Sequence, residues 1–216
     1  MSVDPVALLK KHLGYPGFRP GQEEPVRAVL AGRDALGILP TGGGKSVCYQ
    51  IPALALGGLT LVITPLVSLM EDQVRRAVEA GLRAAFMGSA QEAGERRAIT
   101  EAARKGALDV LFVAPERIGL TPFRRLMAEC DVRLLAVDEA HCISQWGHDF
   151  RPSYREIGRL REWVGCPVLA LTATATPTVR EDVLTNLGMV DPEIVVQSFD
   201  RPNLAWRVER VGAGEN

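Results

Sequence analysis

The segment Leu39-Pro40-Thr41-Gly42-Gly43-Gly44-Lys45-Ser46 decides the fold class of this chain. It follows an apolar run that predicts a β-strand, and it precedes a stretch that predicts a helix. Three successive glycines allow the backbone to turn its N–H groups toward phosphate oxygens, and the start of the next helix adds the positive end of its dipole. The segment therefore predicts a phosphate-binding loop formed by Thr41, Gly42, Gly43, Gly44, Lys45 and Ser46.

The loop predicts specific roles for two of its side chains. Lys45 can reach the β- and γ-phosphates of ATP, and the Ser46 hydroxyl can bind Mg²⁺. The strict P-loop pattern has Gly at the position of Leu39, so the match is incomplete. The alternative is a Gly-rich turn with Lys45 as a solvated charge, and the strand–loop–helix context argues against it.

Short apolar runs alternate with helical periodicity along the chain, which is typical of βαβ units and a parallel sheet. Continuous apolar strands indicate helices on both faces of that sheet. We expect strands at residues 35–39, 59–64, 84–87, 110–114, 134–138, 168–172 and 194–197. We also expect one buried helix face made of Leu66, Leu69, Met70, Val74, Ala77 and Val78. A further helix is expected to be capped by Thr176 before Pro177 and to stop at Gly188.

A pair of acidic residues follows one of these strands. Asp138 and Glu139 come directly after the apolar run Leu134–Val137, at the end of the strand where open α/β sheets bind ligands. Asp138 would hold Mg²⁺, and Glu139 would orient or deprotonate the attacking water. The alternative is that this Asp-Glu pair only caps the N-terminus of a helix. Together with Lys45 and Ser46, the pair predicts hydrolysis of a nucleoside triphosphate.

Composition limits the remaining function classes. The chain has 216 residues and a formal net charge of −1, so a globally basic surface for nucleic acid is excluded and any DNA contact must be local. No apolar run reaches the roughly 18 residues of a membrane span, and the first residues do not form a secretion signal. We expect a cytoplasmic protein without membrane contacts. The four cysteines lack metal-site spacing, so we expect no zinc and small core residues at Cys48, Cys130, Cys142 and Cys166.

Several segments, in order, resemble superfamily 2 helicases and, more narrowly, the RecQ family of DNA helicases. The run 138–142 is similar to the family's DEAH-type Walker B motif, and 143–152 looks like its aromatic-rich loop. Residues 13–22 resemble its adenine-recognition motif, 64–69 its motif Ia, 171–176 its motif III, and 199–204 the passage to a second motor domain. The resemblance runs from about residue 8 to 208 and implies a RecA-like P-loop domain.

The resemblance implies roles for further residues. Adenine would lie near Tyr15, Arg19 and Gln22, and a carboxamide suits the adenine edge. Core packing is the alternative for Tyr15 and the favoured interpretation for Phe18. The loop after Asp138 would sense single-stranded DNA and couple it to ATP hydrolysis through His141, Trp146, His148, Phe150 and Arg151. Exposed aromatic side chains can stack on unpaired bases. The alternative is that Trp146 and Phe150 fold back into the core.

The family resemblance also implies a larger machine. Residues 1–208 would be the first RecA-like motor domain, and 209–216 a flexible tail or the start of a linker to a second motor domain absent here. The complete enzyme would use ATP and Mg²⁺ to move 3′→5′ along DNA, acting on single strands and junctions in repair and recombination, at the nucleoid if bacterial. Alone, the chain is expected to hydrolyse ATP very slowly and not to unwind DNA. The rival interpretations are a small-molecule kinase, a motor acting on RNA, and a module that binds nucleotide or DNA without turnover.

Overall fold

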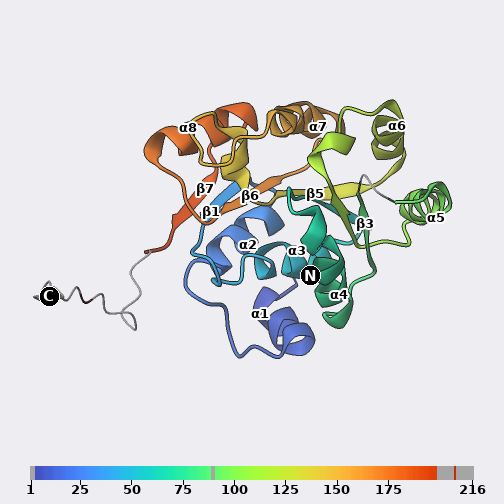
Figure 1. Ribbon diagram of the computed structural model, residues 1–216. Helices are drawn as coiled ribbons and strands as arrows, with labels where there is room; N and C mark the ends of the chain where they lie inside the picture. The colour runs from blue at the N-terminus through green and yellow to red at the C-terminus, as the bar shows by residue number, and fades with distance from the viewer. Residues whose placement is uncertain (1–2, 89–90, 199–206, 208–216) are drawn as a thin grey trace, which may run out of the picture.

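The protein, seen here as a computed structural model that describes residues 3–88, 91–198 and 207, is a three-layer α/β structure (Figure 1). Its central sheet has seven strands, all parallel, in the order β3-β4-β2-β5-β6-β1-β7. The strands are β1 (Ala35–Ile38), β2 (Leu59–Ile63), β3 (Ala84–Met87), β4 (Val110–Val113), β5 (Val132–Val137), β6 (Val168–Thr172) and β7 (Glu193–Val196). All seven predicted strands are confirmed to within two residues at either end.

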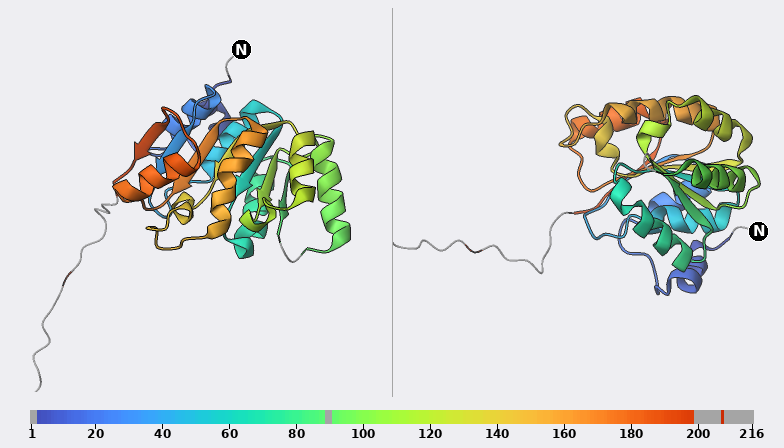
Figure 2. Two further views of the ribbon diagram at one scale, coloured as in Figure 1. Left: turned by 90° about the horizontal axis from the view of Figure 1, so that it is seen from above. Right: turned by 45° about the vertical axis from the view of Figure 1, so that its right-hand side comes forward.

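Helices cover both faces of the sheet (Figure 2). One face carries α1 (Pro5–Leu8), α2 (Glu23–Leu30), α3 (Val47–Leu56) and α4 (Met70–Glu79), and the other carries α5 (Ala93–Arg104), α6 (Thr121–Glu129), α7 (Glu156–Val164) and α8 (Pro177–Asn186). A π-helical turn, η1 (Leu9–Leu13), extends α1. Three short 3₁₀ helices follow strands: η2 (Val67–Leu69) follows β2, η3 (Pro115–Arg117) follows β4, and η4 (Ala140–Ile143) follows β5. A fourth, η5 (Pro152–Arg155), precedes α7.

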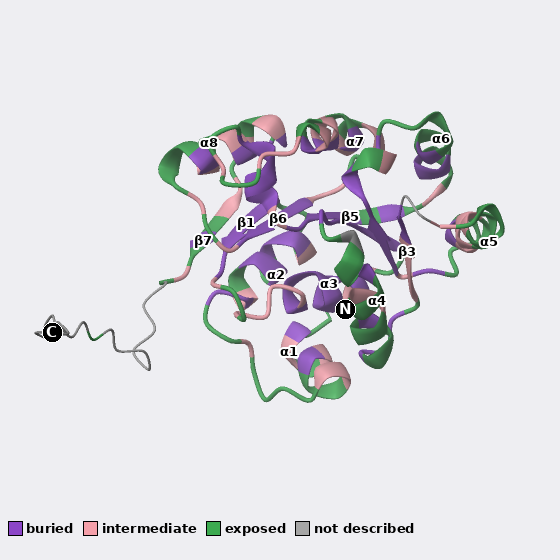
Figure 3. Ribbon diagram, in the orientation of Figure 1, coloured by how far each residue is buried: buried purple, intermediate pink, exposed green. Residues whose placement is uncertain are grey.

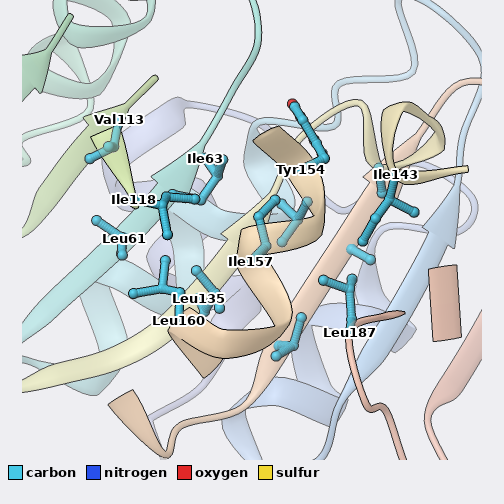
Figure 4. Close-up of a cluster of buried hydrophobic side chains, with 14 of the residues drawn as sticks. Leu61, Ile63, Val113, Ile118, Leu135, Ile143, Tyr154, Ile157, Leu160 and Leu187 are labelled. Carbon is cyan, nitrogen blue, oxygen red and sulfur yellow. The ribbon is translucent and has the colours of Figure 1, made fainter. Parts of the chain in front are cut away.

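The core consists of two apolar layers, one on each side of the sheet (Figure 3). Strands β1, β2 and β4 are buried along their whole length, as expected for parallel strands between two helix layers. In the layer beneath α5–α8, Leu61 and Leu135 of the sheet pack near Ile157 and Leu160 of α7 (Figure 4). Cys48 and Cys142 are fully buried, one in each layer. Cys130 and Cys166 are half-buried and pack against the layer beneath α5–α8.

The predicted buried face over residues 66–78 is partly wrong. Met70 and Ala77 are fully buried, but Leu66, Leu69 and Val78 are 36%, 44% and 54% exposed. Residues 67–69 form the 3₁₀ helix η2, and α4 begins only at Met70. A 3₁₀ helix has fewer residues per turn than an α-helix, so the α-helical spacing of apolar residues does not predict which side chains before Met70 face the core. Val78 lies one residue, about 100° of helix, beyond Ala77 and therefore leaves the buried stripe.

Two predicted helix boundaries are confirmed, and two predicted segments lie outside the described residues. The Thr176 hydroxyl accepts a hydrogen bond from the Val179 N–H at the start of α8, and Gly188 has φ +59° just after its end. The passage at 199–204 and the tail at 209–216 lie outside the described residues. Within the described ranges, no helix is long and apolar enough to cross a membrane.

Candidate nucleotide-binding site

The phosphate-binding loop connects β1 to α3 at the carboxyl edge of the sheet. The Leu39 N–H donates to the Thr172 carbonyl at 3.0 Å, which keeps the start of the loop against β6, and the Gly43 N–H donates to Pro40 at 2.8 Å. Gly44 has φ +75°, and a Cβ there would lie 2.6 Å from the Gln22 amide nitrogen. Only glycine fits this position, because it combines a left-handed backbone with a close neighbour.

The structure brings Lys45 and Glu139 together although 94 residues separate them in sequence. Lys45 Nζ lies 3.3 Å from Glu139 Oε1, and the two side chains are 15% and 22% exposed. Glu139 has φ +46°, an uncommon conformation for a non-glycine residue and one that concentrates at functional sites. The pair places a cation and a carboxylate where β1 and β5 both end.

Asp138 ends β5 as a buried carboxylate. It is 8% exposed, its Oδ1 accepts the Glu139 N–H at 3.0 Å, and its carbonyl accepts the Tyr154 hydroxyl at 2.9 Å. Burial and, after it, the charge of the neighbouring Glu139 raise the pKa of Asp138 to about 6, against the opposing effects of Lys45, the Glu139 N–H and the Gln73 side chain. The carboxylate therefore lies in a place where negative charge is under-compensated by the protein's own groups.

This donor set fits a magnesium ion. Two carboxylates, Asp138 and Glu139, follow β5, and the Ser46 hydroxyl opens α3. Mg²⁺ prefers oxygen ligands from one or two carboxylates together with phosphate oxygens. A cation beside Asp138 would offset the cost of burying its negative charge.

The three predicted adenine-site residues border one cavity of about 740 Å³ between the N-terminal segment, the phosphate-binding loop and α4. Tyr15 is 47% exposed there, and Arg19 donates to the Gly42 carbonyl at 2.9 Å. Gln22 is buried and fully engaged: its amide donates to Gly43 and Gly44 at 2.9 and 3.0 Å, and its carbonyl oxygen accepts the Arg19 N–H at 2.8 Å. Phe18 is half-buried against the core, as its packing interpretation predicts.

The loop that follows η4 exposes an aromatic side chain beside this site. Trp146 is 75% exposed, which excludes the alternative that it folds back into the core. Phe150 is half-buried, with the Arg155 guanidinium 5.3 Å from the centre of its ring. Arg151 donates to the Pro65 carbonyl at 3.2 Å and pairs with Asp149 at 3.1 Å. This loop is therefore joined to the segment that follows β2.

His141 connects the acidic pair to that loop. It is buried, its Nδ1 lies 2.8 Å from the Thr172 hydroxyl and 3.4 Å from Glu139 Oε2, and its ring stacks on His148 at 4.2 Å. The same Thr172 hydroxyl lies 3.1 Å from the Thr174 carbonyl, so it links His141 to the segment that follows β6. Burial lowers the pKa of His141, which favours the neutral ring.

Sequence reasoning missed two residues that position Asp138. The Tyr154 hydroxyl of η5 donates to its carbonyl, and the Gln73 side chain of α4 lowers the pKa of its carboxyl group. Gln73 had a signal in the sequence, because it is a polar residue between Met70 and Ala77 on the buried stripe of an amphipathic helix. Tyr154 had none, since its partner lies 16 residues away.

Comparison with known proteins agrees with this geometry. Residues 19–183 match the family model described as DEAD/DEAH box helicase. The chain is 48% identical over 194 residues to the ATP-dependent DNA helicase RecQ of Pasteurella multocida, covering 89% of this chain and 31% of that protein. It is also 48% identical over 213 residues to the RecQ of Bacillus subtilis, covering 97% of this chain and 36% of that protein. The chain thus spans about a third of the length of these relatives.

Solved structures support the fold. The helicase MrfA bound to DNA and AMPPNP superposes with a TM-score of 0.71 at 18% identity, over 91% of this chain and 29% of that one. A hypothetical ATP-dependent RNA helicase from Sulfolobus tokodaii gives a TM-score of 0.68 at 18% identity, over 89% of this chain and 56% of that one. At these identities the likeness establishes a RecA-like helicase fold, and the matched family model establishes membership. The chain belongs to the DEAD/DEAH box helicase family.

Proposed function

We propose that this chain is the ATP-binding first motor domain of a 3′→5′ DNA helicase of the RecQ type. The complete protein would couple ATP hydrolysis to movement along single-stranded DNA and to unwinding of duplexes and junctions, in repair and recombination at the nucleoid or elsewhere in the cytoplasm. The similarity to RecQ helicases along most of this chain supports the substrate class. The relatives' additional length accommodates a second RecA-like domain, which we propose as the partner of this one.

The observation that carries the proposal is the meeting of Lys45 with Glu139 beside the buried Asp138. Lys45 would exchange Glu139 for the β- and γ-phosphates, and the loop N–H groups of residues 42–46 would bind phosphate oxygens. Magnesium, held by Ser46 and Asp138, would neutralise phosphate charge. Released from Lys45, Glu139 would orient the attacking water and accept its proton.

The remaining residues divide base recognition from DNA coupling. Tyr15, Arg19 and Gln22 border a cavity large enough for a nucleoside, and Arg19 and Gln22 already bond the loop carbonyls. Trp146 would stack on an unpaired base, and the His141–Thr172 hydrogen bond would report its position to Glu139. His148, Phe150 and Arg151 would fix the shape of this loop.

The test is steady-state ATP hydrolysis by this chain with and without single-stranded DNA, beside Lys45→Ala. A second motor domain would supply an arginine finger worth about 10³–10⁵ in rate, so we expect very slow turnover and no unwinding. Nucleotide binding that disappears in Lys45→Ala would support the proposal. Binding that is unaffected by Lys45→Ala would refute it, and many-fold stimulation by DNA would refute the claim that the half motor is inactive.

A further inference from the structure

A buried amide without a partner lies in α3, the helix that follows the phosphate-binding loop. This helix shares one face of the sheet with α2 and α4 (Figure 1). It contains no charged residue, and residues 47–53 are all buried (Figure 3). Gln50 is 4% exposed within this largely apolar segment. Glutamine is seldom buried to this extent without hydrogen bonds to its side chain, so Gln50 needs an explanation.

The Gln50 carboxamide forms no hydrogen bond within the part of the chain that the structure describes. Its backbone N–H donates to the Ser46 carbonyl at 3.0 Å, as in any helix, but the side chain has no such partner. Gln22 shows the contrast, because it is as deeply buried and its side chain forms three hydrogen bonds. Burying an unpaired donor and acceptor is costly. The missing partner must therefore come from outside the protein.

The free carboxamide borders the cavity of about 740 Å³ that is proposed to hold the base. Gln50 is part of the cavity wall, and its amide atoms do not belong to the fully shielded side-chain atoms that lack a partner. They therefore reach the open space of the cavity. Arg76 and Glu79 of α4 also border it, but both are exposed and can turn toward solvent. Gln50 is too buried to do so, and its partner has to enter the cavity.

Helical spacing places Gln50 beyond the phosphate-binding loop. Ser46 and Gln50 both border the cavity and are joined by a helical hydrogen bond, so they lie on one face of α3, about 6 Å apart along its axis. A nucleotide whose phosphates bind the N–H groups of residues 42–46 would extend from Ser46 into the cavity, with its base near Gln50. Tyr15 and Arg19 border the same space and offer flat groups that can cover the face of the base. Gln50 would then contact its edge.

The chemistry of a carboxamide indicates which base it suits. Its NH₂ group donates and its oxygen accepts, side by side. Adenine offers the complementary pair, since its N6 amino group donates and its N7 accepts, and glutamine binds both at once. Guanine has two acceptors on that edge, O6 and N7, so a single carboxamide cannot satisfy both. Because no protein group fixes the Gln50 amide, it is free to turn to match adenine.

We propose that Gln50 is a specificity-determining residue whose carboxamide binds N6 and N7 of adenine inside the cavity. The proposal rests on the proposed function and adds a residue to it. The Gln22 amide already donates to the loop carbonyls, so Gln50 supplies the buried amide that is free to bind the base. Removing this amide should weaken binding of adenine nucleotides and leave binding of the phosphates alone unchanged.

The test measures nucleotide binding by Gln50→Met, which keeps the length of the side chain and removes its amide. Calorimetric titrations of the whole chain use four ligands with Mg²⁺: ATP, 2′-deoxyATP, purine riboside triphosphate, which lacks the N6 amino group, and tripolyphosphate, which lacks base and sugar. Gln91→Met is the matched control, because Gln91 lies before α5 on the other face of the sheet and outside the cavity. Gln50→Leu repeats the measurement in case Gln50→Met fails to fold. Lys45→Ala tests the phosphate site.

We expect Gln50→Met to bind ATP and 2′-deoxyATP about 5- to 150-fold more weakly than the wild type, which is the strength of a bidentate contact between glutamine and adenine. Tripolyphosphate affinity should stay unchanged, because the removed amide does not face the phosphates. The wild type should prefer ATP to purine riboside triphosphate, and this preference should shrink in Gln50→Met. Gln91→Met should match the wild type for every ligand.

Thermal unfolding separates this role from a structural one. Without ligand, Gln50→Met should melt at the same or a higher temperature than the wild type, because it exchanges an unpaired buried amide for an apolar side chain. A Gln50 that only supports the fold would instead lose stability on substitution, and that result would count against the proposal.

Three binding outcomes would also overturn it. ATP affinity is unchanged in Gln50→Met, or tripolyphosphate loses as much affinity as ATP, which would make Gln50 a support of the loop. In the third, ATP binding weakens and 2′-deoxyATP binding does not, which would assign Gln50 to the ribose. Failure of the proposed function is distinct from these, because Lys45→Ala would then bind ATP and tripolyphosphate as the wild type does.

Discussion

Glu139→Gln is predicted to strengthen nucleotide binding while it slows hydrolysis. Lys45 Nζ and Glu139 Oε1 are 3.3 Å apart, which corresponds to a gross attraction of about 5 kcal/mol at an effective dielectric constant of about 20. Desolvation and side-chain ordering cancel most of this attraction, and we take about 1 kcal/mol as the net value for a pair that is largely shielded from water. Phosphates must replace Glu139 on Lys45, so removing the carboxylate charge should raise ATP affinity about fivefold.

The assay is equilibrium titration of a fluorescent ATP analogue, together with single-turnover hydrolysis in the presence of any second motor domain that restores turnover. Hydrolysis should fall by about 10²–10⁴, since the variant loses its general base. Glu116→Gln is the control, because it neutralises another glutamate at the same sheet edge whose partner is Ser153 and not Lys45. Unchanged or weaker binding by Glu139→Gln would show that the ion pair does not compete with nucleotide and would refute the reasoning.

Three further predictions concern stability and DNA binding. Asp34→Asn should lower the free energy of unfolding by about 3 kcal/mol in urea titrations. The reason is that the Asp34 carboxylate is 7% exposed and accepts a hydrogen bond from Arg161 at 2.6 Å. A loss below about 1 kcal/mol would contradict this. Partial burial raises the pKa of Asp109, but hydrogen bonds from Arg83 outweigh burial and leave that pKa below its ordinary value. This pair therefore stabilises the fold at pH values above the unfolded-state pKa, which is near 4. The destabilisation caused by Asp109→Asn should shrink as the pH falls through the lower pKa of the folded state. A difference in thermal unfolding that stays constant down to acidic pH would exclude this linkage. Trp146→Ala should change stability by less than about 0.5 kcal/mol and weaken single-stranded DNA binding by about 5- to 100-fold, and anisotropy titrations that show no change would remove Trp146 from the DNA path.

The strands and the carboxyl-edge site were predictable because their signals are local. Parallel strands buried on both faces produce continuous apolar runs, and the topology of such sheets brings Lys45 after β1 and Glu139 after β5 to one edge. Residues 66–69 were misassigned because a 3₁₀ segment interrupts the helical period, which apolar spacing alone does not reveal.

Partners distant in sequence could not be predicted in this way. The Gln22 side chain is of the type expected to bind adenine. In the structure its amide nitrogen instead donates to two loop carbonyls, 21 and 22 residues away in sequence. The Tyr154 hydroxyl reaches the Asp138 carbonyl from a separate element, η5.

The cavity proposed to hold the base has consequences for how this domain can change over evolution. Its outer wall, from His12 to Gln22, belongs to a segment before the first strand and is attached to the body by the buried Leu9 and by a 3.0 Å hydrogen bond from His12 to the Ala80 carbonyl. The groups proposed to bind phosphate lie instead on the loops of the sheet. If the cavity binds the base as proposed, substitutions in a peripheral segment would change nucleobase preference and leave the proposed hydrolytic groups intact.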